Sequence, residues 1–443
     1  MKRILAVFWM FALVCGLAWA TGAPEAVETG PLELYLAGTP VNSDPNYAFA
    51  AQPFLDEYPD VQLIEVPIDV SDASTMSMDA RLAANLPVHF YNDYYSRAGK
   101  YADPANYHPV NLADYWSAED IADFYPDLIG PYWVDGKLTC APWYQLIVGM
   151  QINLTVLEKV GYELPPVDEW TIDAFYEMAE AVKAAAIPEV WPTMMFAQNR
   201  SGDWHYMLWF ASFGAKLFTD NDYSHTTVSS PEGLAVFEFW KDLQDRGLIP
   251  YEAAVMNDDH LINAREAGQL AAAGARLVNY NSTEAMASKV EQGLIDEPFE
   301  SVFYPFPKAL GVEKVPLLST YNLHVVFDTG DERVNEIAAR FAWHMSNARS
   351  QEHFCSGPDS MAVPSRKSAV VEKEGAEAAL FAGGLALAQA NGYFDVGGSL
   401  PVYNDIRGAL FPQLQLLFSG KASPRQALEL YEQALNEVVA TLE

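Results

Sequence analysis

The strongest constraint on the fold is the alternation of short apolar runs with helix-like segments in the N-terminal part of the chain. Each apolar run is rich in Leu, Val, Ile or aromatic residues and is followed by Gly, Pro or polar residues, as expected for a strand. This pattern predicts strands over residues 32–37, 61–66 and 88–91, and helices over residues 48–58, 78–84 and 94–101. Strands and helices that alternate at this spacing indicate an α/β fold with a mostly parallel sheet.

The middle and the end of the chain are richer in helical patterns, and several of these carry start and stop signals. Asn153, Thr171 and Ser230 each stand as a predicted N-cap before a helix-like stretch. Gly161 ends the first of these stretches and Gly247 ends the last. Further helices are predicted over residues 204–213, 413–418 and 424–442. The length of the chain suits two domains or one large one, and we find no internal repeat.

The N-terminus has the layout of a secretory signal peptide. Lys2 and Arg3 precede an apolar run over residues 4–19, and an Ala-Trp-Ala tripeptide supplies the small residues that signal peptidase recognises. We therefore expect residues 1–20 to be removed by cleavage after Ala20. The mature protein is then expected to be periplasmic or extracellular.

The N-terminus has two alternative fates, a retained membrane anchor and a lipid anchor. A retained membrane anchor would need about 20 apolar residues, and the run is somewhat shorter than that. A lipid anchor at Cys15 would need a small residue immediately before it, where this chain has Val14. Residues 21–30 are small and acidic with Pro and Gly among them, so we expect a tether there.

The charge of the chain excludes some classes of partner. Asp and Glu number 59 against 26 Lys and Arg, which gives a formal net charge of −33. Binding to nucleic acid needs clustered cations, and so does docking on anionic lipid, so both are disfavoured. Beyond the predicted signal the only cysteines are Cys140 and Cys355. An exported chain could join them in a disulfide or bury them as free thiols, and their spacing does not decide between the two.

A series of segments in a fixed order carries a resemblance to a known family. The segments are FLDEYPDVQLIEV (54–66), VDGKLTCAPWYQ (134–145), INLTVLEKVGYELPPVDEWTIDAFYEMAEAV (152–182), SFGAKLF (212–218), SSPEGLAVFEFWKDLQDRGLIP (229–250), FAWHMSN (341–347), MAVPSRKSA (361–369) and SGKASPRQALELYEQALNEV (419–438). In order and spacing they resemble the extracellular solute-binding proteins of family 1, the sugar-binding receptors of bacterial ABC importers. The chain departs from the family at Ile152, where Tyr is usual, and at residues 268–271, which lack the usual Met.

The resemblance implies two α/β lobes joined by crossing strands, in a type II-like periplasmic-binding-protein fold. The ligand of such a protein lies in the cleft between the lobes, which close around it on a hinge. The expected division is lobe one over residues 31–139 and 305–355, lobe two over residues 144–304 and 362–443, and hinge crossings at 140–144 and 356–361, with a further crossing near 303–306. The expected function is that of a monomeric receptor, which delivers a mono- or oligosaccharide to the membrane permease of an ABC importer.

A saccharide site needs flat aromatic walls for the apolar ring faces and planar polar groups for the hydroxyls. Such residues are expected on loops that leave strand ends and on the crossing strands. On these grounds and on the resemblance, the candidate ligand-binding residues are Asn42, Tyr91, Asp93, Tyr94, Trp143, Tyr144, Gln145, Gln198, Trp204, Arg276, Tyr321 and Tyr403.

Three of these candidates have a structural alternative that the sequence leaves open. Tyr91 could lie in the core, because the strand period of two directs alternate residues inward. Trp143 could pack the hinge instead of facing the cleft. Arg276 could form a surface salt bridge rather than a forked contact with a ligand.

Sequence patterns for catalysis and for cofactors are missing. There is no His-Glu-x-x-His or other metal spacing, no nucleophile elbow and no phosphate-binding Gly-rich loop, so we expect no catalytic residue, metal or cofactor. The alternatives in function are a secreted carbohydrate-active hydrolase and a receptor of the same fold for a non-sugar solute. A polyamine site would need several carboxylates in the cleft, and an organic anion would need more cations than Arg276.

Overall fold

The structure is a computed structural model of the chain, and it describes residues 31–68, 76–198, 202–219, 222–277, 283–357 and 360–442. The predicted signal peptide over residues 1–20, its cleavage site after Ala20, Cys15 and the predicted tether over residues 21–30 lie outside the described residues.

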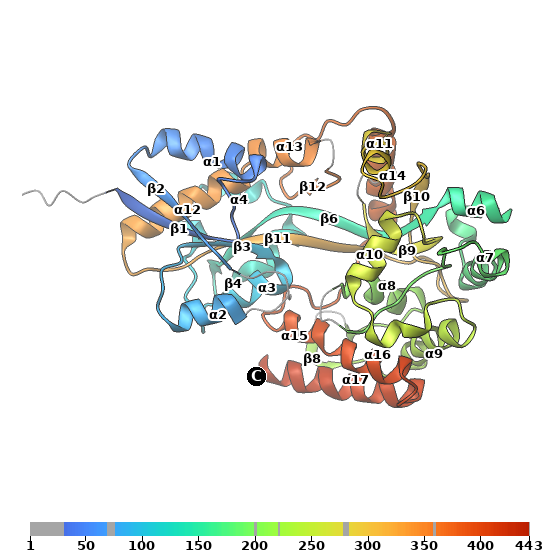
Figure 1. Cartoon of the computed structure of the whole chain (residues 1–443). Helices are drawn as coiled ribbons and strands as arrows, with labels where there is room; N and C mark the ends of the chain where they lie inside the picture. Colours follow the sequence, from blue (N-terminus) through green and yellow to red (C-terminus); the bar gives the residue numbers. More distant parts are fainter. Residues whose placement is uncertain are drawn as a thin grey trace, which may run out of the picture.

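Three parallel strands form one end of the main sheet. They are β1 (Leu32–Ala37), β2 (Val61–Val66) and β3 (Phe90–Tyr94), with β1 in the middle. The helices α1 (Pro45–Glu57) and α12 (Glu332–Ser346) pack together beside this part of the sheet (Figure 1). The first two strands match their predicted bounds. The third begins at Phe90 and runs on to Tyr94, because all five of its residues pair with a neighbouring antiparallel strand.

The longest strand of the described chain, β6 (Cys140–Asn153), runs through both halves of the molecule (Figure 1). Its first part pairs with β11 (Leu318–Val326) and β12 (Val363–Pro364), and its second part with β9 (Ala272–Arg276) and β10 (Ser301–Tyr304). All four pairings are antiparallel. The prediction of a mostly parallel sheet in each lobe is therefore wrong outside β1–β3, because segments from distant parts of the chain pair with β6 in the opposite direction.

β6 and β11 are the strands that connect the two halves, which we call lobe one and lobe two as in the predicted division. The second crossing lies in β11 and not near residues 303–306 as expected. After β10 the chain stays with lobe two, since Lys308 N donates to Trp170 O at 3.1 Å and Phe306 packs on Trp209. β12 pairs with Tyr144 and Gln145 of β6, just after the expected crossing at 356–361. The remaining lobe boundaries stay predictions.

The rest of the fold is mainly helical. Lobe two contains α6 (Leu154–Val160), α7 (Ile172–Ala185), α8 (Trp204–Ser212), α9 (Pro231–Asp245), α10 (Asp258–Glu266), α11 (Thr283–Glu291), α14 (Gly375–Asn391), α15 (Tyr403–Gly408), α16 (Leu410–Phe418), α17 (Pro424–Val439) and the hairpin of β7 (Phe218–Thr219) and β8 (Asp222–Thr226). Lobe one adds α2 (Met76–Ala83), α3 (Tyr95–Tyr101), α4 (Ala118–Ala122), α5 (Pro126–Ile129), α13 (Ala348–Ser356) and the hairpin of β4 (Trp133–Val134) and β5 (Lys137–Leu138).

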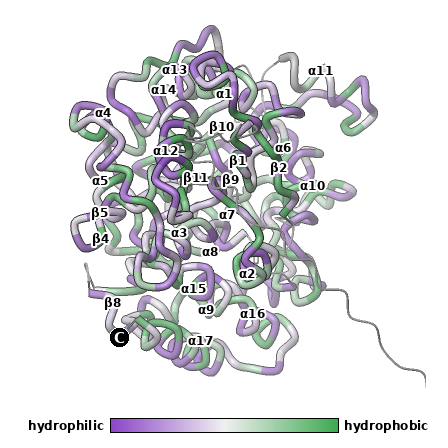
Figure 2. The backbone as a smooth tube through the Cα atoms, turned by 90° about the vertical axis from the view of Figure 1, so that its left-hand side faces the viewer, coloured by the Kyte–Doolittle hydropathy of each residue, from purple (hydrophilic) through white to green (hydrophobic). Residues whose placement is uncertain are grey.

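The predicted helix caps are present. The side chains of Asn153, Thr171 and Ser230 each accept a hydrogen bond from the third backbone N–H of the helix that follows. Gly161 ends α6 in the left-handed conformation, with φ of 70°. The tube in Figure 2 changes between purple and green along the outer helices α12 and α17, as expected for helices with one buried face.

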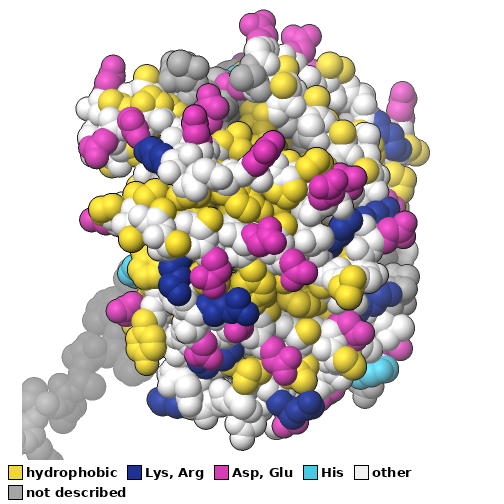
Figure 3. All heavy atoms as spheres, turned by 90° about the vertical axis from the view of Figure 1, so that its right-hand side faces the viewer, with side chains coloured by type: hydrophobic (Ala, Val, Ile, Leu, Met, Phe, Trp, Pro, Cys, Tyr) yellow, Lys and Arg dark blue, Asp and Glu magenta, His cyan; other side chains and the backbone are white. Residues whose placement is uncertain are grey.

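The acidic composition of the chain is visible at its surface. Acidic side chains are scattered over the lobe-two face in Figure 3, with Lys and Arg among them.

Cys140 and Cys355 are buried free thiols, so they form no disulfide in this structure, and burial raises the pKa of both thiols. Within the described residues, no helix combines the length and the apolar character that a membrane span requires.

Candidate functional site

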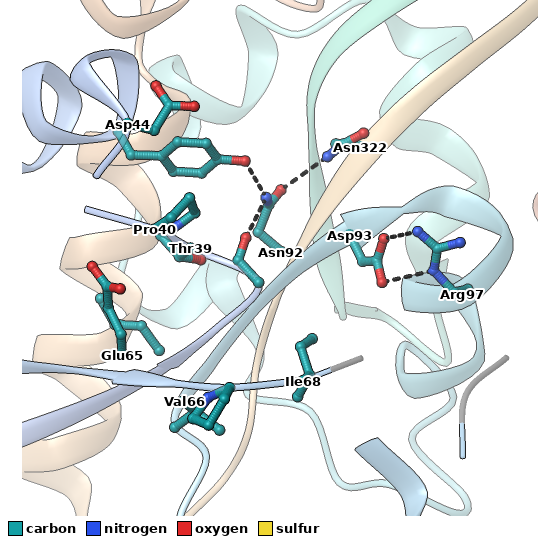
Figure 4. Close-up of a pocket in the computed structure, with 14 residues that line it drawn as sticks. Thr39, Pro40, Asp44, Glu65, Val66, Ile68, Asn92, Asp93, Arg97 and Asn322 are labelled. Atoms are coloured by element: carbon teal, nitrogen blue, oxygen red, sulfur yellow. Dashed lines mark hydrogen bonds and ion pairs between the residues drawn. The ribbon is translucent and has the colours of Figure 1, made fainter. Parts of the chain in front are cut away.

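The carboxyl ends of β1, β2 and β3 surround an open cavity of about 590 Å³ in lobe one (Figure 4). Because parallel strands end at the same edge of a sheet, their following loops meet there. Thr39 and Pro40 come from the loop after β1, and Ile68 from the loop after β2. Asn92 and Asp93 of β3 supply the polar floor.

Asn92 is the centre of the hydrogen-bond network in this cavity. Its Nδ2 donates to Gly38 O at 3.0 Å and to Tyr47 Oη at 2.8 Å, and Asn322 Nδ2 lies 3.5 Å from its Oδ1. Asn322 Oδ1 is buried and has no hydrogen-bond partner in the described chain. An unpaired buried acceptor at the cavity wall can accept a hydrogen bond from a ligand hydroxyl.

Asp93 is held by its neighbours rather than free. Arg97 Nε donates to Asp93 Oδ2 at 2.8 Å, and a second guanidinium nitrogen pairs with Oδ1 (Figure 4). Tyr91 Oη donates to the same carboxylate at 2.6 Å. Tyr91 itself is only 2% exposed, so the structure places it in the core, as the alternative interpretation allowed. Tyr91 and Asp93 therefore orient Arg97, and both Asp93 and Arg97 line the cavity.

A second cavity of about 160 Å³ lies between the lobes. The turn from β3 into α3 lines this cavity from lobe one. The start of α8, together with α10, β9 and α15, lines it from lobe two. Arg97 lines both cavities, so the two are neighbours. The side chains that line it include those of Tyr94, Ser96, Arg97, Asp203, Trp204, Asp258, Arg276 and Arg407.

Polar groups from both lobes meet in this cavity. Arg407 Nη1 donates to Ser96 Oγ at 2.7 Å, which links α15 to α3. Arg407 Nε lies 2.9 Å from Asp203 Oδ1, close enough for an ion pair although not aligned as a hydrogen bond. Tyr403 Oη donates to Asp203 Oδ2 at 2.7 Å, and Tyr95 Oη donates to Tyr403 Oη at 3.3 Å. These buried links hold the two lobes together across the cavity.

Arg276 lies between an aromatic ring of each lobe. Its guanidinium carbon is 4.9 Å from the ring centroid of Tyr94 and 5.1 Å from that of Trp204. Both distances suit a cation–π contact. Trp204 also stacks on His205 at a centroid distance of 3.5 Å. The surface salt bridge considered for Arg276 is not formed, since no carboxylate of the described residues pairs with it.

The hinge candidates do not join this cluster. Trp143 is 1% exposed and packs against Tyr47 and Phe354, which fits the hinge-packing alternative. Tyr144 is half-buried and stacks on Phe354 with ring centroids 4.3 Å apart. Of the hinge candidates, Gln145 alone points to open space, in another cavity.

That other cavity, of about 660 Å³, lies on the opposite face of the hinge strands. Gln145 and Tyr321 line it, whereas Thr320 lines the small cavity, and neighbouring strand residues point to opposite faces. Ser319 Oγ donates to Gln145 Oε1 at 2.9 Å, and the hydroxyls of Tyr321 and Tyr132 are 2.9 Å apart. From the sequence alone, Gln145 and Tyr321 could not be distinguished from the candidates that line the cavity between the lobes.

The last two candidates lie at the surface. Asn42 is exposed and lines neither cavity, and its backbone N donates to Glu65 Oε1. Gln198 is exposed and precedes a segment outside the described residues.

Sequence reasoning missed Asn92, Arg97, Asp203, Asn322 and Arg407. Helical spacing could have found Arg97 and Arg407, since each lies four residues after a candidate, Asp93 and Tyr403.

The arrangement suits binding more than metal chemistry. Within the described chain, no group of three or more His, Cys, Asp or Glu side chains could hold a metal ion. His205 is buried, and burial together with Arg265 and Arg276 holds its pKa well below the ordinary value, so the ring is neutral. The cavities offer stacking surfaces, amides, hydroxyls, carboxylates and guanidinium groups.

The fold is shared with solved structures of low sequence identity. The cyclic alpha-maltosyl-1,6-maltose binding protein from Arthrobacter globiformis is similar over 93% of this chain and 100% of that chain, with 17% identity and a TM-score of 0.68. The maltose-bound MalE3 of T. maritima is similar over 91% of this chain and 99% of that chain, with 15% identity and a TM-score of 0.72. A chitin oligosaccharide binding protein is similar over 92% and 99%, with 18% identity and a TM-score of 0.72.

These likenesses show the two-lobed fold of periplasmic binding proteins, as the sequence predicted. No curated protein sequence matches the chain. The family described as bacterial extracellular solute-binding protein matches residues 50–383, which is well over half of the chain. The chain therefore belongs to the family of bacterial extracellular solute-binding proteins.

Proposed function

We propose that the protein is the extracytoplasmic receptor of an ABC importer and binds a mono- or oligosaccharide between its two lobes. The observation that carries the proposal is the cavity between the lobes, where an aromatic side chain from each lobe meets planar polar groups. Tyr94 and Trp204 provide the rings, and Arg97, Asp203 and Arg407 provide donors and acceptors. Sugars are recognised by this pairing of ring faces with planar polar groups.

The neighbouring cavity in lobe one gives the site room for more than one sugar ring. It is larger than the cavity between the lobes, about 590 Å³ against about 160 Å³, and Arg97 borders both. Asn92 and Asn322 add amide groups at its floor. The structures of similar fold named above include a maltose-bound protein, a cyclic alpha-maltosyl-1,6-maltose binding protein and a chitin oligosaccharide binding protein. Both observations support an oligosaccharide.

The family implies an exported protein, and we propose that the signal peptide over residues 1–20 is cleaved after Ala20. The receptor then works outside the cytoplasm as a monomer and presents its ligand to the membrane permease. The hinge strands β6 and β11 supply the connection about which the lobes would open and close.

We propose binding without catalysis. A glycoside hydrolase needs two carboxyl groups that flank the scissile bond, one of them free to give a proton. Of the carboxylates that line the cavities, Asp93 and Asp203 are each engaged by an arginine, which favours an electrostatic role for both; Asp44, Glu65 and Asp258 also line them. A polyamine receptor would instead present several unpaired carboxylates, and the arginines of the small cavity oppose that alternative.

A thermal-shift panel of neutral saccharides, acidic saccharides and polyamines tests the proposal. A ligand that binds only the folded state raises the melting temperature, by an amount that corresponds to about 2.7 kcal/mol at a hundredfold excess over Kd. We expect at least one saccharide to stabilise the mature protein and to be recovered intact by mass spectrometry. Stabilisation by polyamines alone, or recovery of cleaved saccharide, would contradict the proposal.

A matched pair of variants locates the binding. Trp204→Ala should weaken binding of the stabilising saccharide by about 1–3 kcal/mol, because it removes one of the two aromatic walls. Trp133→Ala is the control, since Trp133 is 42% exposed on the β4–β5 hairpin. Melting temperatures without ligand show whether either change disturbs the fold. Equal affinity in the two variants would place the saccharide elsewhere.

A further inference from the structure

Three guanidinium groups line the small cavity between the lobes, and they differ in how they are neutralised. Arg97 is paired with Asp93, and Arg407 lies 2.9 Å from Asp203. Arg276 has no such partner, since no ion pair or hydrogen bond joins it to any residue of the described chain. In a chain with far more acidic than basic residues, a cation without a carboxylate in a half-buried site is unusual.

The position of Arg276 is fixed by the fold. It is the last residue of β9, where it pairs with Val148 of β6. Its guanidinium is flanked by Tyr94 from lobe one and Trp204 from lobe two, and its Nε is buried without a hydrogen-bond partner. The rings hold the group in place and shield it from water. A donor that is already ordered and partly desolvated binds an acceptor at a smaller entropic cost.

The charged groups around Arg276 are of both signs. Arg265 is 6% exposed, donates to Gly274 O at 3.2 Å and lies 4.0 Å from a carboxylate oxygen of Glu266. Burial is the main cause of the lowered pKa of His205, and both arginines lower it further, because a nearby cation disfavours the protonated ring. Asp258 lines the same cavity but forms no ion pair with Arg276. Within the described residues, Arg276 therefore remains without an ion-pair partner.

We propose that the saccharide bound by this protein carries a carboxylate, as a uronic acid or another sugar acid does, and that Arg276 binds that carboxylate. The inference rests on the proposed function and narrows its ligand class. Guanidinium and carboxylate match in geometry and form paired, charge-assisted hydrogen bonds. Neutral hydroxyls would leave the charge of Arg276 uncompensated once the lobes exclude water.

The acidic character of the whole chain is compatible with an anionic ligand. Exposed charges farther away than about 8 Å are largely screened at physiological ionic strength. Local pairing with Arg276 inside the cavity is screened much less. The net charge of −33 should slow the approach of an anion more than it weakens the bound state.

Calorimetric titration with matched sugar pairs tests the inference. The probes are sodium glucuronate against glucose, sodium galacturonate against galactose, and an unsaturated or saturated diuronate against a neutral disaccharide. We expect at least one acid to bind about tenfold or more tightly than its neutral partner. If neutral sugars bind as well as or better than every acid, the inference is overturned while the saccharide receptor stands. If no saccharide of either kind binds, both fail.

Variants of Arg276 assign the effect to this residue. Arg276→Gln should abolish the preference for the acid, because it should lower the affinity for the acid about tenfold or more relative to the affinity for the neutral partner. Arg276→Lys should keep part of the preference, because it keeps the charge but not the fork. Arg333→Gln, which changes an exposed arginine of α12, is the control. Circular dichroism and melting without ligand verify folding. An unchanged preference in Arg276→Gln would overturn the assignment.

Discussion

Trp143 lies at the centre of an aromatic cluster that joins the hinge strand β6 to α1 and α13. It contacts Tyr47, Phe354 and His324, with ring centroids between 5.0 and 5.4 Å away. Because the indole is 1% exposed, Trp143→Ala should lower the free energy of unfolding by about 3–5 kcal/mol. Denaturant unfolding measures this, with Trp133→Ala as the exposed control. Weakened ligand binding at unchanged stability would show instead that Trp143 forms the wall of the cleft.

His324 gives the stability of the protein a dependence on pH. The ring is buried beside Phe90 and Trp143, and burial lowers its pKa from 6.5 to about 3. In the unfolded chain the same group takes up a proton near pH 6.5. Below that pH the unfolded state therefore binds more protons than the folded state, and stability falls until the pH reaches about 3.

The variant His324→Phe keeps a ring in this position and removes the titration. The loss of unfolding free energy between pH 7 and pH 5 should then be smaller by about 2 kcal/mol than in the unchanged protein. Denaturant unfolding at the two pH values measures the difference. The same loss in both proteins would mean that His324 is not the group that titrates.

At the level of single residues the sequence predicted the aromatic wall and one cation but not the polar partners. Tyr94, Trp204 and Arg276 do line the cavity between the lobes. Helical spacing could have pointed to Arg97 and Arg407, but the direction in which their short helices face depends on packing and not on local sequence. Whether any of these residues touches a ligand stays a prediction.

At the scale of the element, the turn after β1 depends on Gly38. Its φ is 64°, and a Cβ at this position would lie 2.0 Å from Asn92 O on β3. Gly38→Ala should therefore push β1 and β3 apart, destabilise the protein and distort the floor of the lobe-one cavity.

Gly136 provides the matched control for this variant. It also has a positive φ, of 76°, but a Cβ there would meet nothing within 4 Å. Gly136→Ala measures the cost of the left-handed conformation alone, about 1 kcal/mol. The difference between the melting temperatures of the two variants measures the destabilisation caused by the contact between the new Cβ at residue 38 and Asn92 O. Equal shifts would show that this contact does not add to the destabilisation.

Elements with local signals were the most predictable. The caps at Asn153, Thr171 and Ser230 set helix starts correctly, because a cap is a contact over three residues. The helix predicted over residues 413–418 begins at Leu410 instead, since its first turn continues from α15 without a polar cap. The antiparallel pairing of β6 with four strands depends on contacts between residues far apart in sequence, which local patterns do not encode.

At the scale of the whole molecule, two lobes share one sheet through β6 and β11 (Figure 1). Polar links across the cavity, Arg407 to Ser96 and Tyr95 to Tyr403, hold the lobes together in this structure. A ligand placed there would exchange these links for contacts with its own hydroxyl or carboxylate groups. The two-lobed arrangement was predictable from the order of the family-like segments, whereas the position of the second crossing was not.

The most direct test of the central claim is a crystal structure of the mature protein with the saccharide that gives the largest thermal shift. We expect density for one intact saccharide in the cavity that Tyr94, Trp204 and Arg276 line, with polar contacts from both lobes. Density for the saccharide outside this cavity, contacts with one lobe only, or a cleaved product would contradict it.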